Sequence, residues 1–335
     1  VYVEDHDLFK SLCSKDKERY LNGDEELERL INRDDVDIIV CATSGFAGLK
    51  TAYIASKTGK KILLANKESI VAGGDLILPL AKENNTKIIP IDSEHNAIFQ
   101  CLSGEKGTED VKSITITASG GPFINASIHE LQHVTVEDAL NHPNWKMGSK
   151  VTIDSATLVN KCLELIEARY LFDLDEKYFD LVIHPQSIIH SIVTYIDGSS
   201  ICQMSSPDMR VPIAHALSEE NRIPIDFKDL DFSNLNLSFQ EFPSDRSKIQ
   251  DIARDVCNKG GFLGTVFNAA NEIAVESFLN KKINFNEIYE VIYRTFDKNI
   301  VSNEVTIESI NEVDAQTRIH AQKAVSYTHL TLPTK

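Results

Sequence analysis

The stretches VDIIVC (residues 36–41), KILLA (61–65) and KIIPI (87–91) are three short apolar runs separated by segments with helical patterns. Helices are predicted for residues 24–33, 49–58 and 76–84. Short apolar runs that alternate with helices are typical of buried strands in a parallel sheet. The sequence therefore predicts an α/β fold that begins with a doubly wound, Rossmann-like sheet.

The regular alternation ends after residue 113, which divides the chain into regions of different character. Longer strands, predicted for 114–118, 192–195 and 200–204, are mixed with helices and indicate an α+β domain. Helices predicted for 249–258, 264–279, 285–298 and 307–323 indicate a C-terminal helical bundle. The predicted organisation is a sheet domain at 1–91, an α+β domain at 92–223, a linker at 224–243, a helical domain at 244–325 and an anomalous tail at 326–335.

The composition excludes several classes of protein. A formal net charge of -16 argues against a nucleic-acid-binding surface, which needs a basic footprint. No apolar run approaches the ~20 residues that cross a bilayer, and the N-terminus lacks the order of a signal peptide. The six cysteines are scattered without a zinc-binding spacing, so we interpret them as reduced structural thiols. The protein is expected to be located in the cytosol or in an organelle matrix.

Two carboxylates, Asp92 and Glu94, follow the apolar run 87–91. If the extended conformation continued, their side chains would share one face and could bind one cation. Ligands of parallel sheets lie beyond the carboxyl ends of the strands, where Asn66-Lys67-Glu68-Ser69 also falls. The alternative is that Asp92 or Ser93 only caps a helix beginning near Asn96. The pair by itself does not decide between these two interpretations.

A second polar group falls on a helix predicted to begin at Asp154-Ser155-Ala156-Thr157. Asn160 and Lys161 precede Glu164 by four and three residues, so the three side chains lie on one side of the helix. A hydroxyl, an amide and an ammonium on the first turns of a helix make a good phosphate site. The carboxylate one turn further on would reach a metal. A solvated helix face is the alternative.

Three further motifs are candidates for ligand binding. The only tryptophan lies in the loop HPNWKMG (142–148), which suggests a lid over a ligand, although it could anchor the loop instead. The turn SGGP (119–122) could bind an anion through backbone amides, or be an ordinary turn. His184 and His190 are interpreted as packing or supporting residues, because carboxylates suit a hard cation better than zinc.

Seven motifs follow one another in a characteristic order and spacing. They are LANKES (64–69), IDSEHNA (91–97), SGGPF (119–123), HPNWKMG (142–148), the stretch 154–164, HPQS (184–187) and NAANE (268–272). Together they resemble the 1-deoxy-D-xylulose 5-phosphate reductoisomerase family from about residue 1 to residue 325. The resemblance implies an NADPH-dependent, metal-dependent oxidoreductase with an isomerase step. Its expected product is 2-C-methyl-D-erythritol 4-phosphate, a precursor in non-mevalonate isoprenoid biosynthesis.

The resemblance also assigns roles to individual residues. It implies that Asp92, Glu94 and Glu164 bind Mg²⁺ or Mn²⁺ and act in catalysis with Lys67. The implied substrate contacts are Lys67, Ser93, Glu94, Ser119, His142, Ser155, Asn160, Lys161 and Glu164, with the phosphate on Ser119, Ser155, Asn160 and Lys161. The implied NADPH contacts are Asn66, Glu68 and Gly148, while Trp145 and Met147 would belong to a flap. His95 and His190 are expected to be supporting residues.

The chain departs from the family pattern at its N-terminus. It begins with Val1, and the glycine-rich turn of the family's first βα unit is expected to precede that residue. The resemblance therefore implies an NADPH domain that lacks its first βα units, and weak NADPH binding by these 335 residues alone. Robust NADPH oxidation by the 335-residue chain would contradict this expectation.

Two other functions are consistent with parts of the sequence. A metal-dependent phosphosugar isomerase or aldolase without a redox step would turn over without NADPH. A non-catalytic binding chain would keep its role after alanine substitution of the three carboxylates. The family resemblance favours the reductoisomerase, binding a small phosphosugar and forming a homodimer, with no nucleic-acid or membrane partner.

Overall fold

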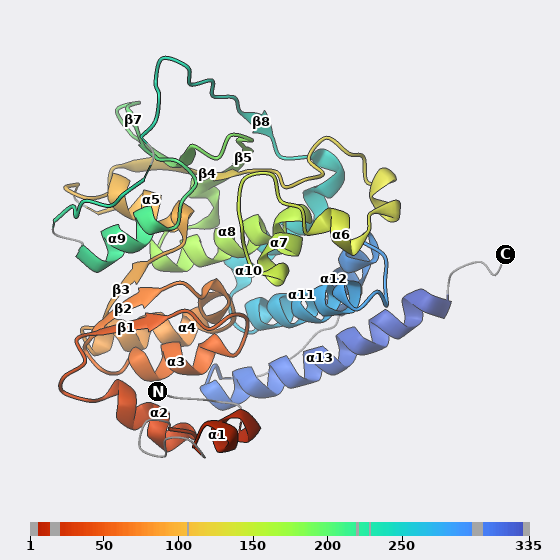
Figure 1. The fold of residues 1–335 in the computed structure, drawn as a ribbon, viewed down its shortest axis with the longest axis horizontal. Coiled ribbons are helices and arrows are strands. Elements are labelled where there is room, and N and C mark those ends of the chain that lie inside the picture. The colour runs from red at the N-terminus through yellow and green to blue at the C-terminus, as the bar shows by residue number, and fades with distance from the viewer. Residues whose placement is uncertain are drawn as a thin grey trace.

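In the computed structural model the three N-terminal apolar runs form one parallel sheet, in the order β1-β2-β3 (Figure 1). Its strands are Ile38–Cys41, Lys61–Leu64 and Lys87–Pro90. The prediction of an α/β fold built on a parallel sheet is confirmed. The structure describes residues 6–13, 21–105, 107–218, 221–227, 229–296 and 304–330.

Helices cover both faces of this sheet because alternate side chains of each strand point to opposite faces. On one face, Ile39 and Ile62 join the main core together with side chains of α3 (Gly48–Ala55) and α4 (Lys67–Glu83). On the other face, Leu63 and Ile89 pack with Ala216 of α9 (Arg210–Ser218) and with Phe99 of α5 (Ser93–Cys101). The N-terminal helices are α1 (His6–Cys13) and α2 (Asp24–Ile31).

Helix α4 begins nine residues earlier than the predicted helix 76–84, so the prediction of its start is wrong. The side chain of Asn66 caps the helix by accepting a hydrogen bond from the Ser69 amide at 2.9 Å. Gly73 has non-helical dihedral angles, and Pro79 lies further along. Glycine and proline both weaken the local helical signal. The segment Asn66-Lys67-Glu68-Ser69 is therefore a helix N-terminus at the carboxyl edge of the sheet.

A second, mixed sheet follows, in the order β7-β6-β4-β5-β8, as predicted for an α+β region. Its strands are Val111–Ala118 (β4), Phe179–Ile183 (β5), Ile189–Tyr195 (β6), Ser200–Met204 (β7) and Gln240–Glu241 (β8). β4 runs parallel to β5 and antiparallel to β6. Between β4 and β5 lie α6 (Val136–Ala139), α7 (Ser149–Ala156) and α8 (Val159–Leu171). The division of the chain into domains stays a prediction.

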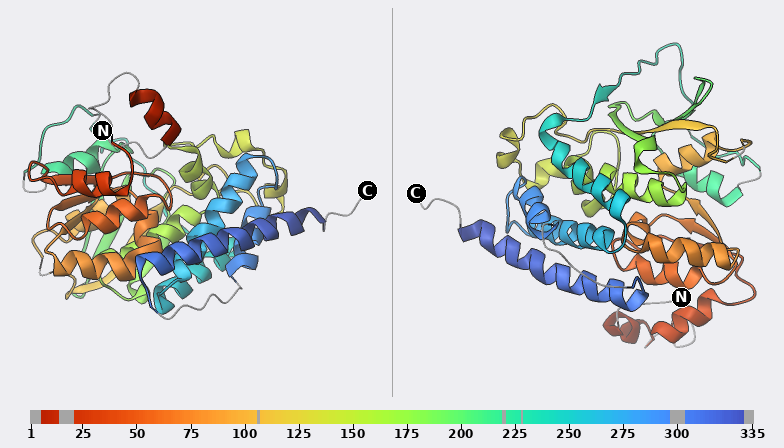
Figure 2. Two further views of the ribbon diagram at one scale, coloured as in Figure 1. Left: turned by 90° about the horizontal axis from the view of Figure 1, so that it is seen from below. Right: turned by 180° about the vertical axis from the view of Figure 1, so that it is seen from behind.

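The C-terminal part is helical, as predicted, and consists of α10 (Ser247–Lys259), α11 (Leu263–Leu279), α12 (Glu287–Phe296) and α13 (Ile307–Leu330). α11 packs against α12 and α13, and also against α4 and α7. Figure 2 shows α13 running along the outside of the molecule. α13 continues to Leu330, so residues 326–330 of the predicted anomalous tail continue the helix. Residues 297, 298 and 331–335 lie outside the described part.

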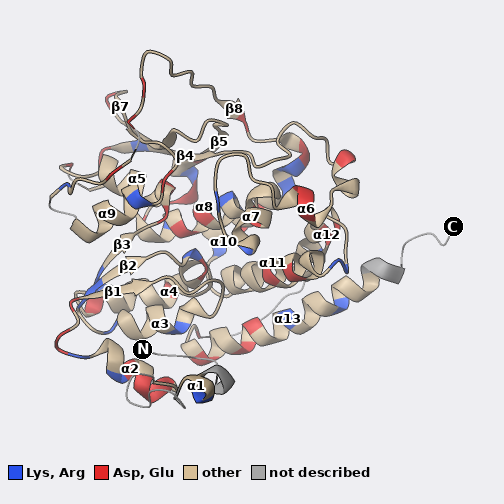
Figure 3. Ribbon diagram, in the orientation of Figure 1, with Lys and Arg blue, Asp and Glu red and all other residues tan. Residues whose placement is uncertain are grey.

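The distribution of charged residues and the state of the cysteines agree with what the composition indicated. Among the described residues, Lys and Arg lie scattered between Asp and Glu rather than gathered on one element (Figure 3). In the same part of the chain, no helix is both long and apolar enough to span a membrane. The five cysteines whose side chains are described are free thiols, and all except Cys202 are buried.

Candidate active site

A cavity of about 230 Å³ opens where α4, α5 and α8 begin. Twelve residues with roles implied by the resemblance line it. They are Lys67, Asp92, Ser93, Glu94, Ser119, His142, Trp145, Met147, Ser155, Asn160, Lys161 and Glu164. The three implied NADPH contacts, Asn66, Glu68 and Gly148, are not among its lining residues. The structure therefore brings the predicted metal and substrate residues together and places the predicted cofactor residues beside them.

Three carboxylates converge in this cavity. Oxygen atoms of Asp92, Glu94 and Glu164 all lie within 4.8 Å of one another. The strand does not continue through Asp92, as one interpretation required, because α5 begins at Ser93. Asp92 caps α5 by accepting a hydrogen bond from the Glu94 amide at 3.2 Å, and its other oxygen faces the cavity residue Lys67. The interpretation of Asp92 as a helix cap is confirmed, and its second oxygen still faces the cavity, so cation binding by Asp92 stays a prediction.

Two lysines bridge the carboxylates. The Lys67 ammonium lies 2.7 Å from Asp92 and 2.9 Å from Glu164. The Lys161 ammonium lies 2.9 Å from Glu94 and 2.5 Å from Glu164. Asn160 completes the cluster, because it donates to Glu164 at 2.5 Å and accepts from Lys67 at 2.9 Å. In this arrangement Asn160 and Lys161 are directed to the carboxylates rather than to Ser119 and Ser155.

The cluster carries an excess of negative charge. Burial and the neighbouring Glu164 carboxylate raise the pKa of Glu94 to about 7. Burial alone would also raise the pKa of Asp92, but the Lys67 ammonium lowers it below its usual range. Burial opposes the charge of Lys67, but Asp92 and Glu164 hold its pKa well above the ordinary value. Burial is the main cause of the raised pKa of Glu94, and repulsion from Glu164 adds to it against the opposing charge of Lys161.

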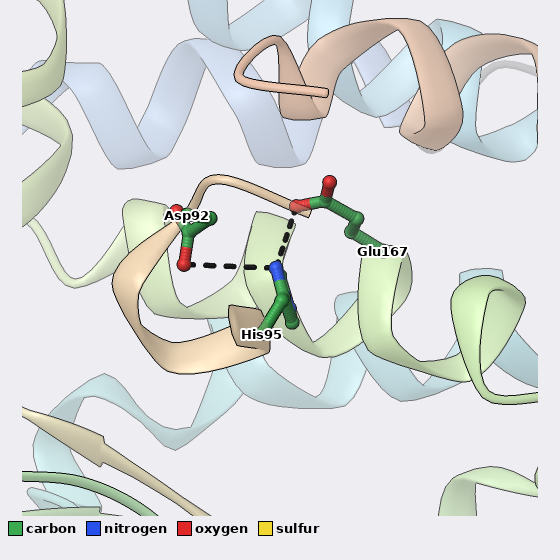
Figure 4. Close-up of side chains that lie close together, drawn as sticks. All are labelled: Asp92, His95 and Glu167. Atoms are coloured by element: carbon green, nitrogen blue, oxygen red, sulfur yellow. Dashed lines mark ion pairs between the residues drawn. The ribbon is translucent and has the colours of Figure 1, made fainter. Parts of the chain in front are cut away.

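His95 lies between Asp92 and Glu167 and contacts both (Figure 4). Its Nδ1 lies 2.9 Å from Glu167 and 3.6 Å from Asp92, and its Nε2 lies 2.9 Å from the Glu164 carbonyl oxygen. Burial alone would lower the pKa of His95, but Glu167 and Asp92 raise it to about 9. Its two ring nitrogens connect His95 of α5 to Glu167 and Glu164 of α8, and its raised pKa favours the protonated form. Both neighbouring carboxylates are thereby held in place.

A second polar group lies at the other end of the cavity, around His142. Its Nδ1 accepts hydrogen bonds from the Asn144 and Trp145 amides at 3.1 and 3.0 Å. Its Nε2 must then carry the hydrogen, and it lies 3.1 Å from the hydroxyls of both Ser119 and Ser155. Burial lowers the pKa of His142, which favours this neutral form. His142 therefore organises the 142–148 loop and presents a donor beside two hydroxyls.

The helix predicted to begin at Asp154 is in fact two helices, and this part of the prediction is wrong. Asp154 and Ser155 lie in the last turn of α7, and α8 begins at Val159 after a left-handed Leu158. Asp154 is buried in an ion pair with Lys150 at 2.8 Å, so it does not act as a helix cap. Asn160 and Lys161 do lie in the first turn of a helix, as the phosphate-site prediction required.

The sequence and fold were compared with known proteins. Sequence models match residues 1–74 (1-deoxy-D-xylulose 5-phosphate reductoisomerase), 88–172 (the C-terminal domain of the same family) and 204–320 (DXP reductoisomerase C-terminal domain). The 1-deoxy-D-xylulose 5-phosphate reductoisomerase of Chloroherpeton thalassium is 45% identical over 92% of this chain and 80% of its own length. The enzyme of Francisella tularensis subsp. novicida is 46% identical over 89% of this chain and 78% of its own length.

This chain belongs to the 1-deoxy-D-xylulose 5-phosphate reductoisomerase family. Solved reductoisomerase structures have the same fold. One, a complex with NADPH, fosmidomycin and magnesium, superposes with a TM-score of 0.90 at 39% identity, covering 98% of this chain and 86% of that one. The Zymomonas mobilis enzyme in complex with NADPH superposes with a TM-score of 0.88 at 39% identity. The match covers 97% of this chain and 85% of that one.

The reductoisomerase cavity also involves residues that the sequence did not single out. Val151 and Met209 line it. Glu167 lies behind it, and its spacing of three from Glu164 on one helix was a signal that could have been used. Met209 lies just ahead of α9, far along the chain, and no local pattern marks it.

His190 makes the stability of this protein depend on pH. It is 4% exposed, its ring lies 6.2 Å from that of Trp145, and burial together with the Lys161 charge lowers its pKa to about 4. An unfolded histidine titrates near 6.5, so the unfolded state binds more protons between these values. This contribution to stability is complete above about pH 6.5 and is lost as the pH falls toward 4.

When the pH falls from about 7 to 5, the free energy of unfolding of His190→Gln should drop by about 2 kcal/mol less than that of the wild type. Urea unfolding at the two pH values measures the difference. The exposed residue His133 offers the control, since His133→Gln should follow the wild type. Equal acid sensitivity in wild type and His190→Gln would contradict the prediction.

Proposed function

We propose that this protein catalyses the NADPH-dependent, divalent-metal-dependent rearrangement and reduction of 1-deoxy-D-xylulose 5-phosphate to 2-C-methyl-D-erythritol 4-phosphate. The observation that carries the proposal is the convergence of Asp92, Glu94 and Glu164 within 4.8 Å in a cavity. Membership of the family supports it. So does the close similarity to a reductoisomerase that binds NADPH, fosmidomycin and magnesium.

The three carboxylates fit a hard divalent cation. All their donor atoms are oxygens, which Mg²⁺ and Mn²⁺ prefer to nitrogen or sulfur ligands. The three carboxylates outnumber the two lysines of the cluster, so a bound cation would balance the charge of the ionised site. Such an ion would supply Lewis-acid polarisation of the substrate's carbonyl and hydroxyl oxygens. Asp92, Glu94 and Glu164 would hold it, with His95 and Glu167 fixing their orientation.

The protein's own side chains bind and orient the phosphosugar. Lys67 lies beside the carboxylates and can donate a hydrogen bond to a substrate oxygen on which negative charge develops. Ser119, Ser155 and the Nε2 hydrogen of His142 offer donors for the phosphate at the far end of the cavity. Asn160 and Lys161, at the first turn of α8, contact carboxylates in this structure, and in the proposal they turn to the phosphate when the substrate binds. Phosphate binding away from the reacting carbons orients them for reaction.

The 142–148 loop, with Trp145 and Met147 lining the cavity, acts as a flap in this proposal. Its closure would exclude water from the reacting centre. Asn66, Glu68 and Gly148 are the proposed cofactor contacts, and the helix N-terminus at Asn66 lies at the carboxyl edge of the parallel sheet, where dinucleotides bind. NADPH would supply the hydride that reduces the rearranged aldehyde.

The test is an assay of the gene product that carries these residues. With 1-deoxy-D-xylulose 5-phosphate and Mg²⁺ or Mn²⁺, we expect one NADPH consumed for each molecule of product, no turnover after chelation of the metal, and inhibition by fosmidomycin. Absorbance of NADPH and NMR identification of the product are the measurements. Conversion of the substrate without NADPH would contradict the proposal and favour an isomerase or aldolase.

We also propose a homodimer located in the cytoplasm or an organelle matrix. Exposed apolar side chains on the edge strand β7 and in the following segment support the dimer, notably Ile201, Phe232 and Phe239. The free, mostly buried thiols support a reducing compartment. Light scattering coupled to gel filtration measures the oligomeric state, and a monomeric mass would contradict the dimer.

A further inference from the structure

The motif NAANE (268–272) on α11 has no part in the cavity, yet its polar side chains are buried or half-buried. Asn271 is fully buried and donates a hydrogen bond to Asp154 of α7 at 2.8 Å. Asp154 pairs with Lys150, and Lys150 donates to Glu68 at 2.7 Å. A chain of polar contacts thus connects α11, through α7, to the start of α4. It fixes α11 relative to the carboxyl edge of the parallel sheet.

The neighbouring residue Glu272 extends from this anchored helix to the turn after β1. Its Oε1 accepts hydrogen bonds from the Phe46 amide at 2.8 Å and from Asn268 at 3.0 Å. Its Oε2 accepts from Arg318 of α13 at 2.5 Å. Arg318 also pairs with Asp314 at 2.7 Å. Both carboxylate oxygens of Glu272 are therefore occupied by donors, and Arg318 balances its charge.

The turn between Gly45 and Gly48 is held between Glu272 and Asn66. Gly45 has a φ of +70°, and a Cβ added there would lie 2.9 Å from the Glu272 Oε1. A Cβ added at Gly48 would lie 2.4 Å from the Asn66 Oδ1. Asn66 also donates to the Gly45 carbonyl oxygen at 2.9 Å. The conformation of this turn is thus set by one side chain from α11 and one from the start of α4.

This turn follows β1 at the carboxyl edge of the parallel sheet and leads into α3. In open α/β sheets, nucleotides bind at this edge and contact the turns between strands and helices. A turn whose geometry is fixed before binding avoids the entropy cost of ordering it when a nucleotide binds. The contacts of Glu272 supply that restraint from a helix more than two hundred residues further along the chain.

We propose that Glu272 is a positioning residue for the nicotinamide cofactor: by holding the Gly45–Gly48 turn between α11 and Asn66, it preorganises the cofactor edge of the sheet. This inference rests on the proposed function and adds to it a part for the C-terminal helices. Glu272 does not line the cavity and acts only through the turn.

The test compares Glu272→Gln and Glu272→Ala with the control Glu276→Gln, which changes an exposed residue one turn further along α11. Glutamine keeps the shape of the side chain. However, with its oxygen on Phe46 and Asn268 its amide hydrogens would face the donors of Arg318. We expect Glu272→Gln to raise the Kd for NADPH about tenfold, Glu272→Ala to raise it at least as much, and Glu276→Gln to leave it unchanged.

Three measurements separate this role from a merely structural one. Calorimetry with NADPH gives the cofactor Kd, calorimetry with Mn²⁺ gives the metal Kd, and thermal unfolding gives Tm. We expect the Mn²⁺ Kd of Glu272→Gln to stay within about twofold of the wild type. An unchanged NADPH Kd in Glu272→Gln would overturn the inference, as would an equal loss of NADPH and Mn²⁺ binding. Should Glu272→Ala fail to fold, Glu272→Gln alone decides.

Failure of the inference is distinguishable from failure of the proposed function. A wild-type gene product that binds Mn²⁺ but neither binds nor oxidises NADPH would contradict the proposed function and, with it, this inference. A wild type that binds NADPH, together with a Glu272→Gln variant that binds it equally well, would overturn only the positioning role.

Discussion

The substitution Glu164→Gln is expected to lower kcat/KM by about 10³-fold or more, equivalent to about 4 kcal/mol of transition-state stabilisation. Glu164 is 1% exposed and contacts Lys67, Lys161 and Asn160. Glutamine keeps the shape of the side chain but removes one of three anionic groups. The divalent-ion affinity should fall together with the activity, because the metal loses a charged ligand.

The stability of the Glu164→Gln protein should respond differently from its activity. The Glu164 carboxylate contributes to the raised pKa of Glu94, so removing its charge relieves repulsion within the metal-free cluster. Both lysines keep another carboxylate partner, Asp92 or Glu94. We therefore expect little change in the metal-free free energy of unfolding, despite the large loss of activity.

Steady-state kinetics, Mn²⁺ calorimetry and urea unfolding together test this prediction. The control is Glu308→Gln, which changes an exposed glutamate of α13 and should behave as the wild type in all three. Retention of more than about a tenth of the wild-type activity by Glu164→Gln would contradict a role for this carboxylate in holding the metal.

The substitution Lys67→Met is expected to destabilise the metal-free protein by about 3–5 kcal/mol, because it leaves buried carboxylates without their main counter-charge. The Lys67 side chain is 10% exposed, and its ammonium contacts Asp92, Glu164 and Asn160. After the substitution, Lys161 and His95 are the remaining cations of the cluster. The methionine side chain has a similar length, so the loss is mainly electrostatic.

A divalent ion should restore much of this stability, because it neutralises the same carboxylates that Lys67 bridges. Saturating Mg²⁺ or Mn²⁺ is therefore expected to raise the unfolding free energy of Lys67→Met by more than that of the wild type. Even with metal bound, the activity of Lys67→Met should remain about 10²-fold or more below that of the wild type, because the ammonium beside the substrate is missing.

Urea unfolding with and without metal is the measurement, and Lys259→Met, at an exposed lysine of α10, is the matched control. An equal effect of metal on the wild type and on Lys67→Met would contradict the shared-charge explanation. So would a metal-free Lys67→Met protein as stable as the wild type.

Much of the fold could be predicted because its signals are local. The runs 36–41, 61–65 and 87–91 are apolar and lie between helical patterns, so a parallel sheet follows from short-range sequence. The start of α4 was missed because Gly73 and Pro79 obscure the helical pattern. The break between α7 and α8 was missed for a different reason. Asp154, which has the chemistry of a helix cap, is satisfied inside α7 by Lys150 and Asn271.

The sequence by itself determined the α/β class, the three strands of the parallel sheet, and the position of Asp92 and Glu94 at the end of a strand. It also placed Glu164 one turn beyond Asn160 and Lys161. These results depend on periodicity and spacing over a few residues. Family resemblance, rather than spacing, joined the two groups of side chains around one ion.

Only the tertiary structure decided which side chains meet across long separations. It brings Glu164 to Asp92 and Glu94, places Lys67 and Lys161 between them, and sets His95 and Glu167 behind them. It also brings Glu272 to the Gly45–Gly48 turn. The physical reason is that a buried charge must find a partner, and the partner's position depends on how helices pack in space, which no local sequence pattern records.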